Sequence, residues 1–351
     1  MPNIQKPYTG NLLLNAAAFM VVVAGMRAAS SLVVRLLLAF FIAFICGPLF
    51  FQLKKYKVPT AIGIIIVLLV IIGFGSLLGV MVGTSINDFT ETWPVYQDKF
   101  MRLVSGTIAY LNEKGVEIPR QTVLDVVNPG TIMNFIGGML TTLTSMLSET
   151  LLILITVVFL LLEAASVPGK VMAVWGEESK TMVELKRFAK VMQRYIAIKT
   201  VISLVTGLMV GFSMVFVGVD FALLWGLLTF LLNYVPTIGS IIAAVPPTLL
   251  AFVQLGWIHA LIVLAIFLVI NMVIGNIVEP RTMGIGMGLS TLIVFISLVF
   301  WGWVLGPVGM LLSVPLTMSV KIYLESREST QWIGILLGRP IADDGAGVKT
   351  G

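Results

Sequence analysis

The chain has 351 residues, of which 58% are hydrophobic and only 11% charged, and its mean hydropathy is +1.04. Soluble domains are roughly 45–50% apolar, so this composition excludes a single water-soluble core and indicates a membrane protein. The net charge of +5 is modest and its basic residues lie in particular loops, which favours membrane orientation over nucleic-acid binding. A single cysteine, Cys46, excludes an intrachain disulfide and a CxxC metal or redox motif.

Eight apolar segments approach or exceed the ~20 residues that cross a bilayer. A further apolar stretch, 221–254, is interrupted at Asn233 to Gly239 and again at Pro246-Pro247, so two short helical arms joined by a bend fit it better than one helix. This hairpin is either re-entrant or fully spanning. The sequence therefore predicts an all-α polytopic membrane protein with a broken hairpin and with amphipathic helices outside and inside. The eight predicted membrane helices are 12–28, 30–52, 58–84, 146–164, 200–218, 258–278, 289–304 and 306–323.

Loop charges predict the orientation. The short loop after the second span carries Lys54, Lys55 and Lys57 without an acid, so the positive-inside rule places it in the cytoplasm. Segment 85–148 then lies outside, the basic segment 165–199 returns to the cytoplasm, and both termini are cytoplasmic.

Two segments between the spans have helical apolar stripes. The outer stripe includes Tyr96 and Phe100 and predicts an amphipathic helix that lies on the membrane or packs on a neighbouring helix. The inner stripe runs from Met182 to Tyr195, opposite basic residues, and predicts a helix at an anionic cytoplasmic membrane surface. The small polar tail after Gly338 is expected to be disordered.

A short internal repeat lies in the C-terminal apolar region. Residues 241–248 resemble residues 310–317, with Pro246 and Pro315 separated by 69 positions, and each unit follows a bend that contains proline and glycine. One span separates the units, so the second should run opposite to the first. Inverted repeats with broken helices are a transporter architecture, although chance similarity among apolar residues is an equal alternative.

The predicted parts are N-terminal membrane helices 1–84, an outer segment 85–148, a membrane helix 149–164, a cytoplasmic segment 165–199, a transport core 200–323 and a cytoplasmic tail 324–351.

Polar residues cluster around these breaks. An unpaired polar group inside a membrane is costly, so each needs a partner or a watery cavity. For Asn271 an interhelical hydrogen bond is the simpler reading. Glu279 and Arg281 flank a proline at a predicted cytoplasmic end, where an interfacial ion pair and a role in gating or ion coupling are equal alternatives.

Glycines at GxxxG spacing, such as Gly75/Gly79/Gly83 and Gly207/Gly211, predict close helix packing within the chain or between subunits.

Sequence motifs for catalysis are absent. The chain has no Walker A, HExxH or GxSxG motif, and its predicted spans contain no aspartate pair for an intramembrane protease. An enzyme is therefore not expected, and neither a cofactor nor a metal is predicted. A membrane scaffold is a weaker alternative, because it gives no reason for paired broken helices.

Several motifs resemble the autoinducer-2 exporter family over nearly the whole chain. They include Asn233-Tyr-Val-Pro236-Thr-Ile-Gly239-Ser, Gly275-Asn-Ile-Val-Glu279-Pro280-Arg281 and Trp301-Gly-Trp303-Val-Leu-Gly306-Pro-Val-Gly309. This resemblance implies a bacterial inner-membrane exporter that assembles as a homo-oligomer, plausibly a pentamer, contacts lipid and lacks an ATPase subunit. Other members of the family look like sodium/proton antiporters, so the cargo stays open between a small polar solute and an ion.

The two kinds of cargo need different chemistry. Autoinducer-2 is small and polyhydroxylated, so a path for it needs neutral donors and acceptors, whereas an antiporter would rely on the Glu279 carboxylate. Glu279 and Arg281 are the expected gating or ion-coupling pair. The predicted substrate path consists of Asn233, Pro236, Thr237, Gly239, Ser240 and Asn276.

Overall fold

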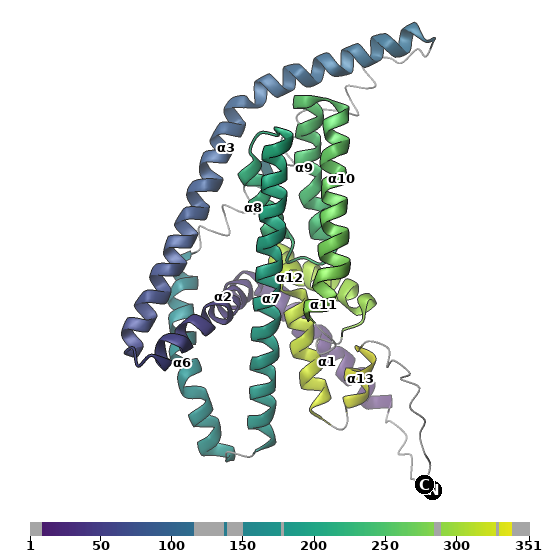
Figure 1. Cartoon of the computed structure of the whole chain (residues 1–351). Coiled ribbons are helices and arrows are strands. Elements are labelled where there is room, and N and C mark those ends of the chain that lie inside the picture. The colour runs from purple at the N-terminus through teal and green to yellow at the C-terminus, as the bar shows by residue number, and fades with distance from the viewer. Residues whose placement is uncertain are drawn as a thin grey trace, which may run out of the picture.

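The computed structural model describes residues 9–115, 137–138, 150–176, 179–283, 289–327 and 330–338, and within these ranges the secondary structure is entirely helical (Figure 1). The fold is therefore the all-α arrangement that the sequence predicts. The tail after Gly338 and most of segment 116–149 lie outside the described residues. The helices are α1 Thr9–Ala28, α2 Ser30–Lys55, α3 Thr60–Glu113, α6 Thr150–Trp175, α7 Lys180–Val217, α8 Ala222–Leu232, α9 Ile238–Leu255, α10 Trp257–Val273, the π-helix η1 Ile274–Val278, α11 Glu279–Met283, α12 Thr291–Glu325 and α13 Gln331–Leu336.

Helices α2, α3 and α6 form one packed group around Phe50, Val67 and Val157, each of which is fully buried. α3 differs from the prediction of a span and a separate outer helix, because it is one continuous helix. The polar residues after 84 end the apolar stretch but do not interrupt the backbone hydrogen bonds of a helix. Figure 1 shows α3 changing direction toward its end, and Pro94 within it lacks the N–H that would complete the helical ladder.

Helices α8 and α9 form a hairpin whose open end is tied together. The main-chain N–H of Asp220, just before α8, donates to Oε1 of Gln254 near the end of α9 (3.0 Å). Nε2 of Gln254 donates to the carbonyl of Gly218, the residue that ends α7 (3.1 Å). Both ends of the hairpin therefore lie beside the same end of α7, as the hairpin predicted for 221–254 requires. The second break predicted within it, at Pro246-Pro247, is wrong, because α9 continues through both prolines.

Helix α12 is a second hairpin. Its backbone leaves the helical conformation at Gly306, where φ is 68° and ψ is −152°, a combination that glycine adopts without steric cost. The indole N–H of Trp301 donates to Oγ1 of Thr317 at 3.0 Å. In a straight helix these residues would be about 24 Å apart, so the two arms, 291–305 and 307–325, fold back on each other.

The two hairpins point in opposite directions along α7. The α8–α9 hairpin opens at the C-terminal end of α7, through Gly218. The α12 hairpin opens at the N-terminal half of α7, where Arg187 pairs with Glu325 (3.4 Å). Thr237 and Gly306 both have positive φ and, like the repeated prolines Pro246 and Pro315, they are 69 positions apart. The breaks and the opposed directions agree with the inverted repeat predicted from the sequence.

The apolar face of the N-terminal half of α7 packs on other helices of the protein. The apolar stripe predicted from Met182 to Tyr195 does form one helix face, but Phe188 packs edge-on against Phe44 of α2, with ring centroids 6.3 Å apart. Tyr195 belongs to a buried cluster with Val314 of α12. The prediction of a surface-lying amphipathic helix is wrong in this respect, because α7 runs without interruption into the membrane-spanning bundle (Figure 1).

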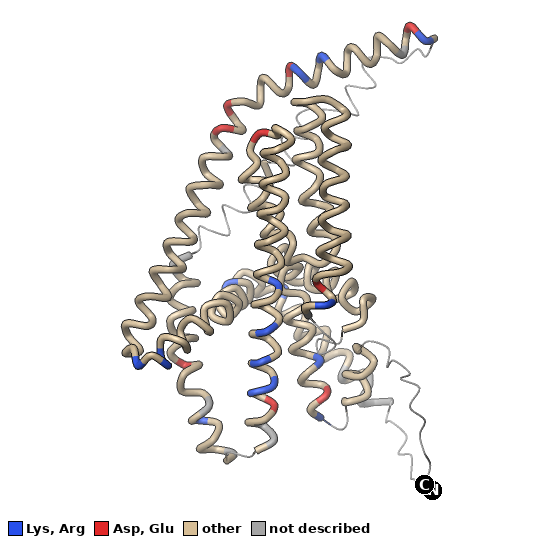
Figure 2. The backbone as a smooth tube through the Cα atoms, viewed as in Figure 1, with Lys and Arg blue, Asp and Glu red and all other residues tan. Residues whose placement is uncertain are grey.

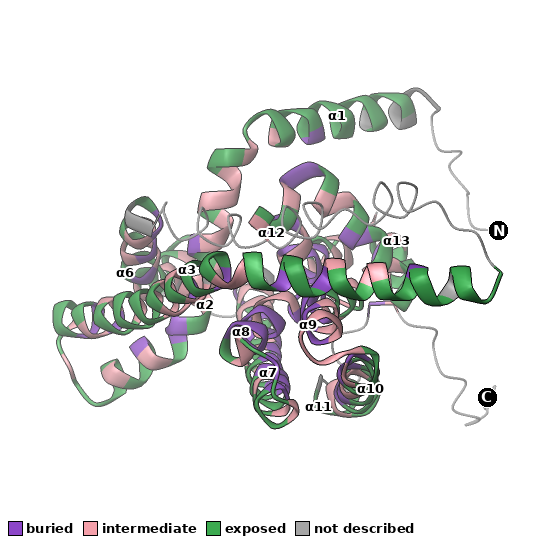
Figure 3. Cartoon of the chain, turned by 90° about the horizontal axis from the view of Figure 1, so that it is seen from above, coloured by how far each residue is buried: buried purple, intermediate pink, exposed green. Residues whose placement is uncertain are grey.

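The buried residues concentrate in α7, α8 and α9, whereas α1 is almost wholly exposed (Figure 3). Large apolar side chains are exposed along α1, α3 and α10, including Leu13, Phe74 and Leu268. A water-soluble protein would not expose so much apolar surface, whereas a membrane protein presents it to lipid. Among the described residues, six helices are long and apolar enough to cross a membrane, namely α2, α3, α7, α9, α10 and α12, and shorter apolar helices lie in α1, α6 and α8.

Basic residues gather at one end of the structure. Figure 2 shows Lys and Arg along the lower half of α7 and at the loop between α2 and α3, which lie at the same level. The outer part of α3 carries both signs of charge. This distribution is the one that the positive-inside rule associates with a single cytoplasmic face.

Candidate functional site

The tip of the α8–α9 hairpin is a strained turn. α8 ends at Leu232, and Thr237 has φ 60° and ψ −57°, a conformation that L-residues rarely adopt. The N–H of Ile238 donates to the carbonyl of Pro236 at 2.6 Å, which closes a three-residue γ-turn around Thr237. This γ-turn form is rare, and such strain persists only where the surrounding structure enforces it. The predicted break therefore exists, and it is a defined turn.

Two side-chain hydrogen bonds fix the tip to the middle of α7. Nδ2 of Asn233 donates to Oγ of Ser203 at 3.0 Å, and both residues are buried. The hydroxyl of Tyr234 donates to Oγ1 of Thr200 at 2.7 Å, and Thr200 donates in turn to the carbonyl of Ile196. Asn233 is thus a buried amide with a partner, which a polar group in apolar surroundings requires.

Glycines let the hairpin approach α7 closely. A Cβ on Gly207 would lie 2.6 Å from the carbonyl oxygen of Gly226, and one on Gly226 would lie 2.8 Å from that of Gly207. The predicted Gly207/Gly211 step therefore packs within the chain, against α8. At the tip, a Cβ on Gly239 would overlap the carbonyl oxygen of Leu232, so only glycine fits the turn.

A buried ion pair lies beside the tip on α7. Nζ of Lys199 is 2.6 Å from Oε1 of Glu279, and the lysine side chain is only 3% exposed while that of Glu279 is 23% exposed. The predicted partner of Glu279 was Arg281, and this is wrong: Arg281 is exposed, and the carboxylate turns toward α7. Glu279 follows directly on η1, and single π-turns within helices are frequent at functional sites.

The structure brings together five of the six residues predicted to form the substrate path. Asn233, Pro236, Thr237, Gly239 and Ser240 all belong to the tip, where Ser240 donates to the carbonyl of Thr237 (3.0 Å). The sixth, Asn276, is exposed on η1. The transport roles of these residues stay predictions.

Sequence reasoning missed the side of the site that α7 supplies. It counted Lys199 as one of several loop charges and gave no role to Thr200 or Ser203, which accept hydrogen bonds from the tip. One signal could have found this face, because Lys199, Ser203 and Thr206 recur at intervals of four and three residues. Charged and hydroxyl residues at that spacing on an apolar helix indicate an inward-facing polar stripe.

The base of the hairpin is held by the outer part of α3. The hydroxyl of Tyr96 donates to Oδ2 of Asp220 at 2.5 Å, and the indole N–H of Trp225 donates to the carbonyl of Asp220 at 2.8 Å. Phe89 of α3 packs edge-on against Phe221 at 5.7 Å between ring centroids. The outer stripe of α3 thus packs on a neighbouring hairpin, which was one of its two predicted positions.

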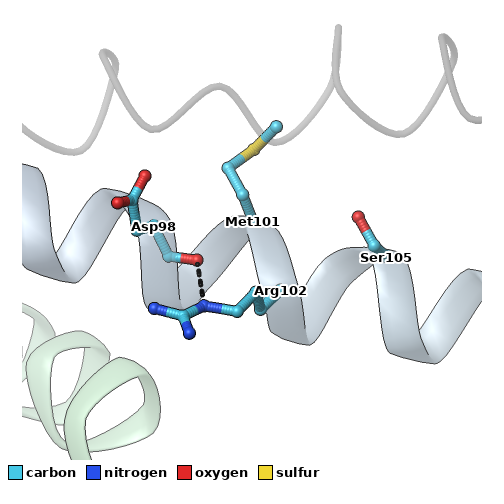
Figure 4. A pocket seen from close by; sticks show the side chains of 4 residues that line it. All are labelled: Asp98, Met101, Arg102 and Ser105. Atoms are coloured by element: carbon cyan, nitrogen blue, oxygen red, sulfur yellow. Dashed lines mark hydrogen bonds between the residues drawn. The ribbon is translucent and has the colours of Figure 1, made fainter.

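A shallow hollow on α3 lies away from this site. It has a volume of about 350 Å³ and is lined by residues from successive turns of one helix (Figure 4). Nε of Arg102 donates to the carbonyl of Asp98 within it (3.3 Å), so its guanidinium already has a local partner. The lining residues are Asp98, Met101, Arg102 and Ser105.

No group of three or more His, Cys, Asp and Glu side chains in the described part of the chain is placed to hold a metal ion. The polar groups of the hairpin tip are hydroxyls, amides and one ion pair, which suit hydrogen bonding to a solute more than metal coordination.

Comparison with known proteins agrees with this architecture. The profile of the AI-2E family transporters matches residues 14–328. The chain belongs to this family. It is 39% identical over 326 residues to the AI-2 transport protein TqsA of Escherichia coli K12, which covers 93% of this chain and 95% of that protein. It is also 39% identical over 341 residues to the putative transport protein YhhT of the same strain, covering 96% and 97%.

A further relative, a putative transport protein of Haemophilus influenzae, is 38% identical over 334 residues, with 93% of this chain and 95% of that protein covered. The three proteins match this chain across nearly their whole length; TqsA is named as a transport protein and the other two as putative transport proteins. The AI-2E family membership confirms the family expected from the motifs, and the chain is a multi-pass membrane transporter.

Proposed function

We propose that this chain exports a small uncharged polar solute, and that AI-2 is its cargo. The observation that carries the proposal is the set of neutral donors and acceptors at the tip of the α8–α9 hairpin, where Asn233 and Tyr234 contact Ser203 and Thr200 of α7. Hydroxyls and amides exchange hydrogen bonds with a polyhydroxylated solute without requiring a charge on it. The name of TqsA as an AI-2 transport protein supports the same cargo.

The position of the tip suits a transport path. α8 has 11 residues and is therefore about 16 Å long, roughly half of the ~30 Å hydrocarbon thickness. If the end of α7 near Gly218 lies at one membrane surface, a hairpin of this length that enters there reaches mid-membrane depth with its strained turn. Irregular backbone is tolerated there only where protein or a watery cavity satisfies it, and broken helices near the midplane are where transporters bind their cargo.

The proposal includes the setting of the protein. The basic end of the structure faces the cytoplasm with both termini, and the membrane is a bacterial inner membrane. The exposed apolar faces of α1, α3 and α10 contact lipid or further copies of the chain in a homo-oligomer, for which we propose a pentamer.

Sodium/proton antiport is the second candidate. Glu279 favours it, because a partly exposed carboxylate at the inner end of the hairpin site can bind a cation or a proton. The two candidates differ in what Glu279→Gln does. In an antiporter this substitution should abolish sodium-driven proton movement. In an exporter of a neutral solute it should leave the transport of that solute intact.

Flux measurements in proteoliposomes that contain the full chain test the proposal. We expect saturable flux of labelled AI-2 and no flux of labelled sodium, with and without a pH gradient. Asn233→Leu should lower AI-2 flux at least about tenfold, if the amide contributes one hydrogen bond of about 1.4 kcal/mol or more to the bound cargo. Asn271→Leu is the matched control, since it removes an amide from α10 that makes no side-chain hydrogen bond to the described residues of the tip. Sodium-dependent proton movement without AI-2 flux would establish the antiporter instead.

A further inference from the structure

The ion pair of Lys199 and Glu279 closes a segment of the chain that is almost free of charge. From Thr200 to Val278 the only Asp, Glu, Lys or Arg is Asp220. Asp220 lies at the far end of the hairpin, where Tyr96 donates to it. Lys199 and Glu279 are therefore the first ionised groups that border the hairpin site at its inner end.

The pair adjoins the proposed binding groups. Lys199 precedes Thr200, which accepts a hydrogen bond from Tyr234 of the tip. Tyr195, one helical turn before Lys199, is buried, and Ser203, one turn after Lys199, accepts a hydrogen bond from Asn233 of the tip (3.0 Å). The ammonium, the carboxylate and the polar groups of the tip thus form one connected cluster from α7, the hairpin and α11.

A contribution to folding stability does not by itself explain why the protein has such an ion pair. Replacing a buried ion pair by apolar residues is often neutral or stabilising, because each charge loses its hydration on burial. A charge inside a membrane protein is a functional candidate for the same reason. At 2.6 Å the two opposite charges sum to zero, so the pair adds no net charge to the site and its dipole field falls off faster with distance than the field of a single charge.

We propose that Lys199 and Glu279 determine specificity, by keeping the transport site electrically neutral so that it admits uncharged polar solutes and excludes both cations and anions. This inference rests on the proposed function and deepens it. Its physical basis is that one unpaired charge in a low-dielectric site attracts ions of the opposite sign, whereas a matched pair attracts neither. Removing one partner should therefore create an ion leak whose sign is set by the partner that remains.

The test uses the full chain in proteoliposomes and three probes: labelled AI-2, labelled sodium and labelled chloride. Lys199→Met leaves the carboxylate unpaired and should raise sodium flux by about tenfold or more, the lower end of the effect of a focused charge on local ion concentration. Glu279→Gln leaves the ammonium unpaired and should raise chloride flux by a similar factor. The double variant Lys199→Met/Glu279→Gln should again exclude both ions. Lys190→Gln is the control, since this exposed charge on α7 lies outside both the pair and the predicted transport path.

A charge-swapped variant, Lys199→Glu/Glu279→Lys, keeps the inference testable if an unpaired buried charge prevents folding of the single variants. It should exclude both ions, and ion flux through it at the level expected of the single variants would overturn the inference. The inference also fails if the single variants fold and pass no more of either ion than wild type. The proposed function fails separately, if wild type moves no AI-2 while the single variants show the ion leaks of opposite sign.

Discussion

The hydrogen bond between Asn233 and Ser203 can be measured by a double-mutant cycle. The bond joins the hairpin tip to α7 at 3.0 Å between two buried side chains. Asn233→Leu leaves Ser203 without this donor, and a buried group that loses its partner costs about 1–3 kcal/mol. Interhelical hydrogen bonds within membranes are worth about 0.6 kcal/mol on average and up to about 1.7 kcal/mol. We therefore expect a coupling energy of about 0.5–1.5 kcal/mol between Asn233→Leu and Ser203→Ala.

The assay is the free energy of unfolding in detergent for wild type, both single variants and the double variant, together with AI-2 flux for each. Thr206→Ala is the matched control. Thr206 lies on the same buried face of α7, but its hydroxyl donates to the carbonyl of Ile202 in its own helix (2.8 Å). It should therefore combine additively with Asn233→Leu. If Asn233→Leu and Ser203→Ala are also additive within about 0.3–0.5 kcal/mol, the hydrogen bond does not hold the tip and the reasoning is refuted.

Three further predictions concern orientation, the turn and the outer contact. On a Cys46→Ser background, Lys186→Cys should react with a membrane-impermeant thiol reagent only from the cytoplasmic side and Lys114→Cys only from outside; the reverse pattern would invert the topology. Gly239→Ala should destabilise the protein by about 1–3 kcal/mol, because its Cβ meets the Leu232 carbonyl, and wild-type stability would show that the turn is loose. Tyr96→Phe should lower the free energy of unfolding by about 0.5–1.5 kcal/mol, because it removes the hydrogen bond to Asp220, and an unchanged free energy would show that this bond does not stabilise the hairpin.

Helices and breaks were predictable because their causes are local. Pro236 and Gly239 stand close together in one apolar stretch, and this coincidence predicts the hairpin of 221–254. Proline alone is a weaker signal, because α9 continues through Pro246 and Pro247. The end of α3 was not predictable in the same way. The polar residues after position 84 mark where the apolar stretch ends, but a helix continues through polar residues as long as no turn signal stops it.

The partners of polar residues were not predictable, because they depend on contacts between distant parts of the chain. Lys199 and Glu279 are 80 positions apart, and only the packing of α11 on α7 brings them together. The nearby Arg281 was the natural candidate from sequence, but it is exposed. The spacing of the glycines likewise predicted close helix packing at some positions but not at others. Gly207 packs against α8, whereas at Gly75 an added Cβ would meet no atom of the described residues within 4 Å.

The two opposed hairpins share their backbone breaks but not their chemistry. The first tip carries an amide and a phenol that bond to α7, through Asn233 and Tyr234. The second tip, at Gly306, is preceded by Val304 and Leu305, which are buried in an apolar cluster with residues of α1 and α2. The two hairpins therefore share their bends, while the first tip carries polar side chains and the second tip carries apolar ones. We infer that the α8–α9 tip meets the cargo, and that the α12 tip anchors the opposite side of the bundle to the N-terminal helices.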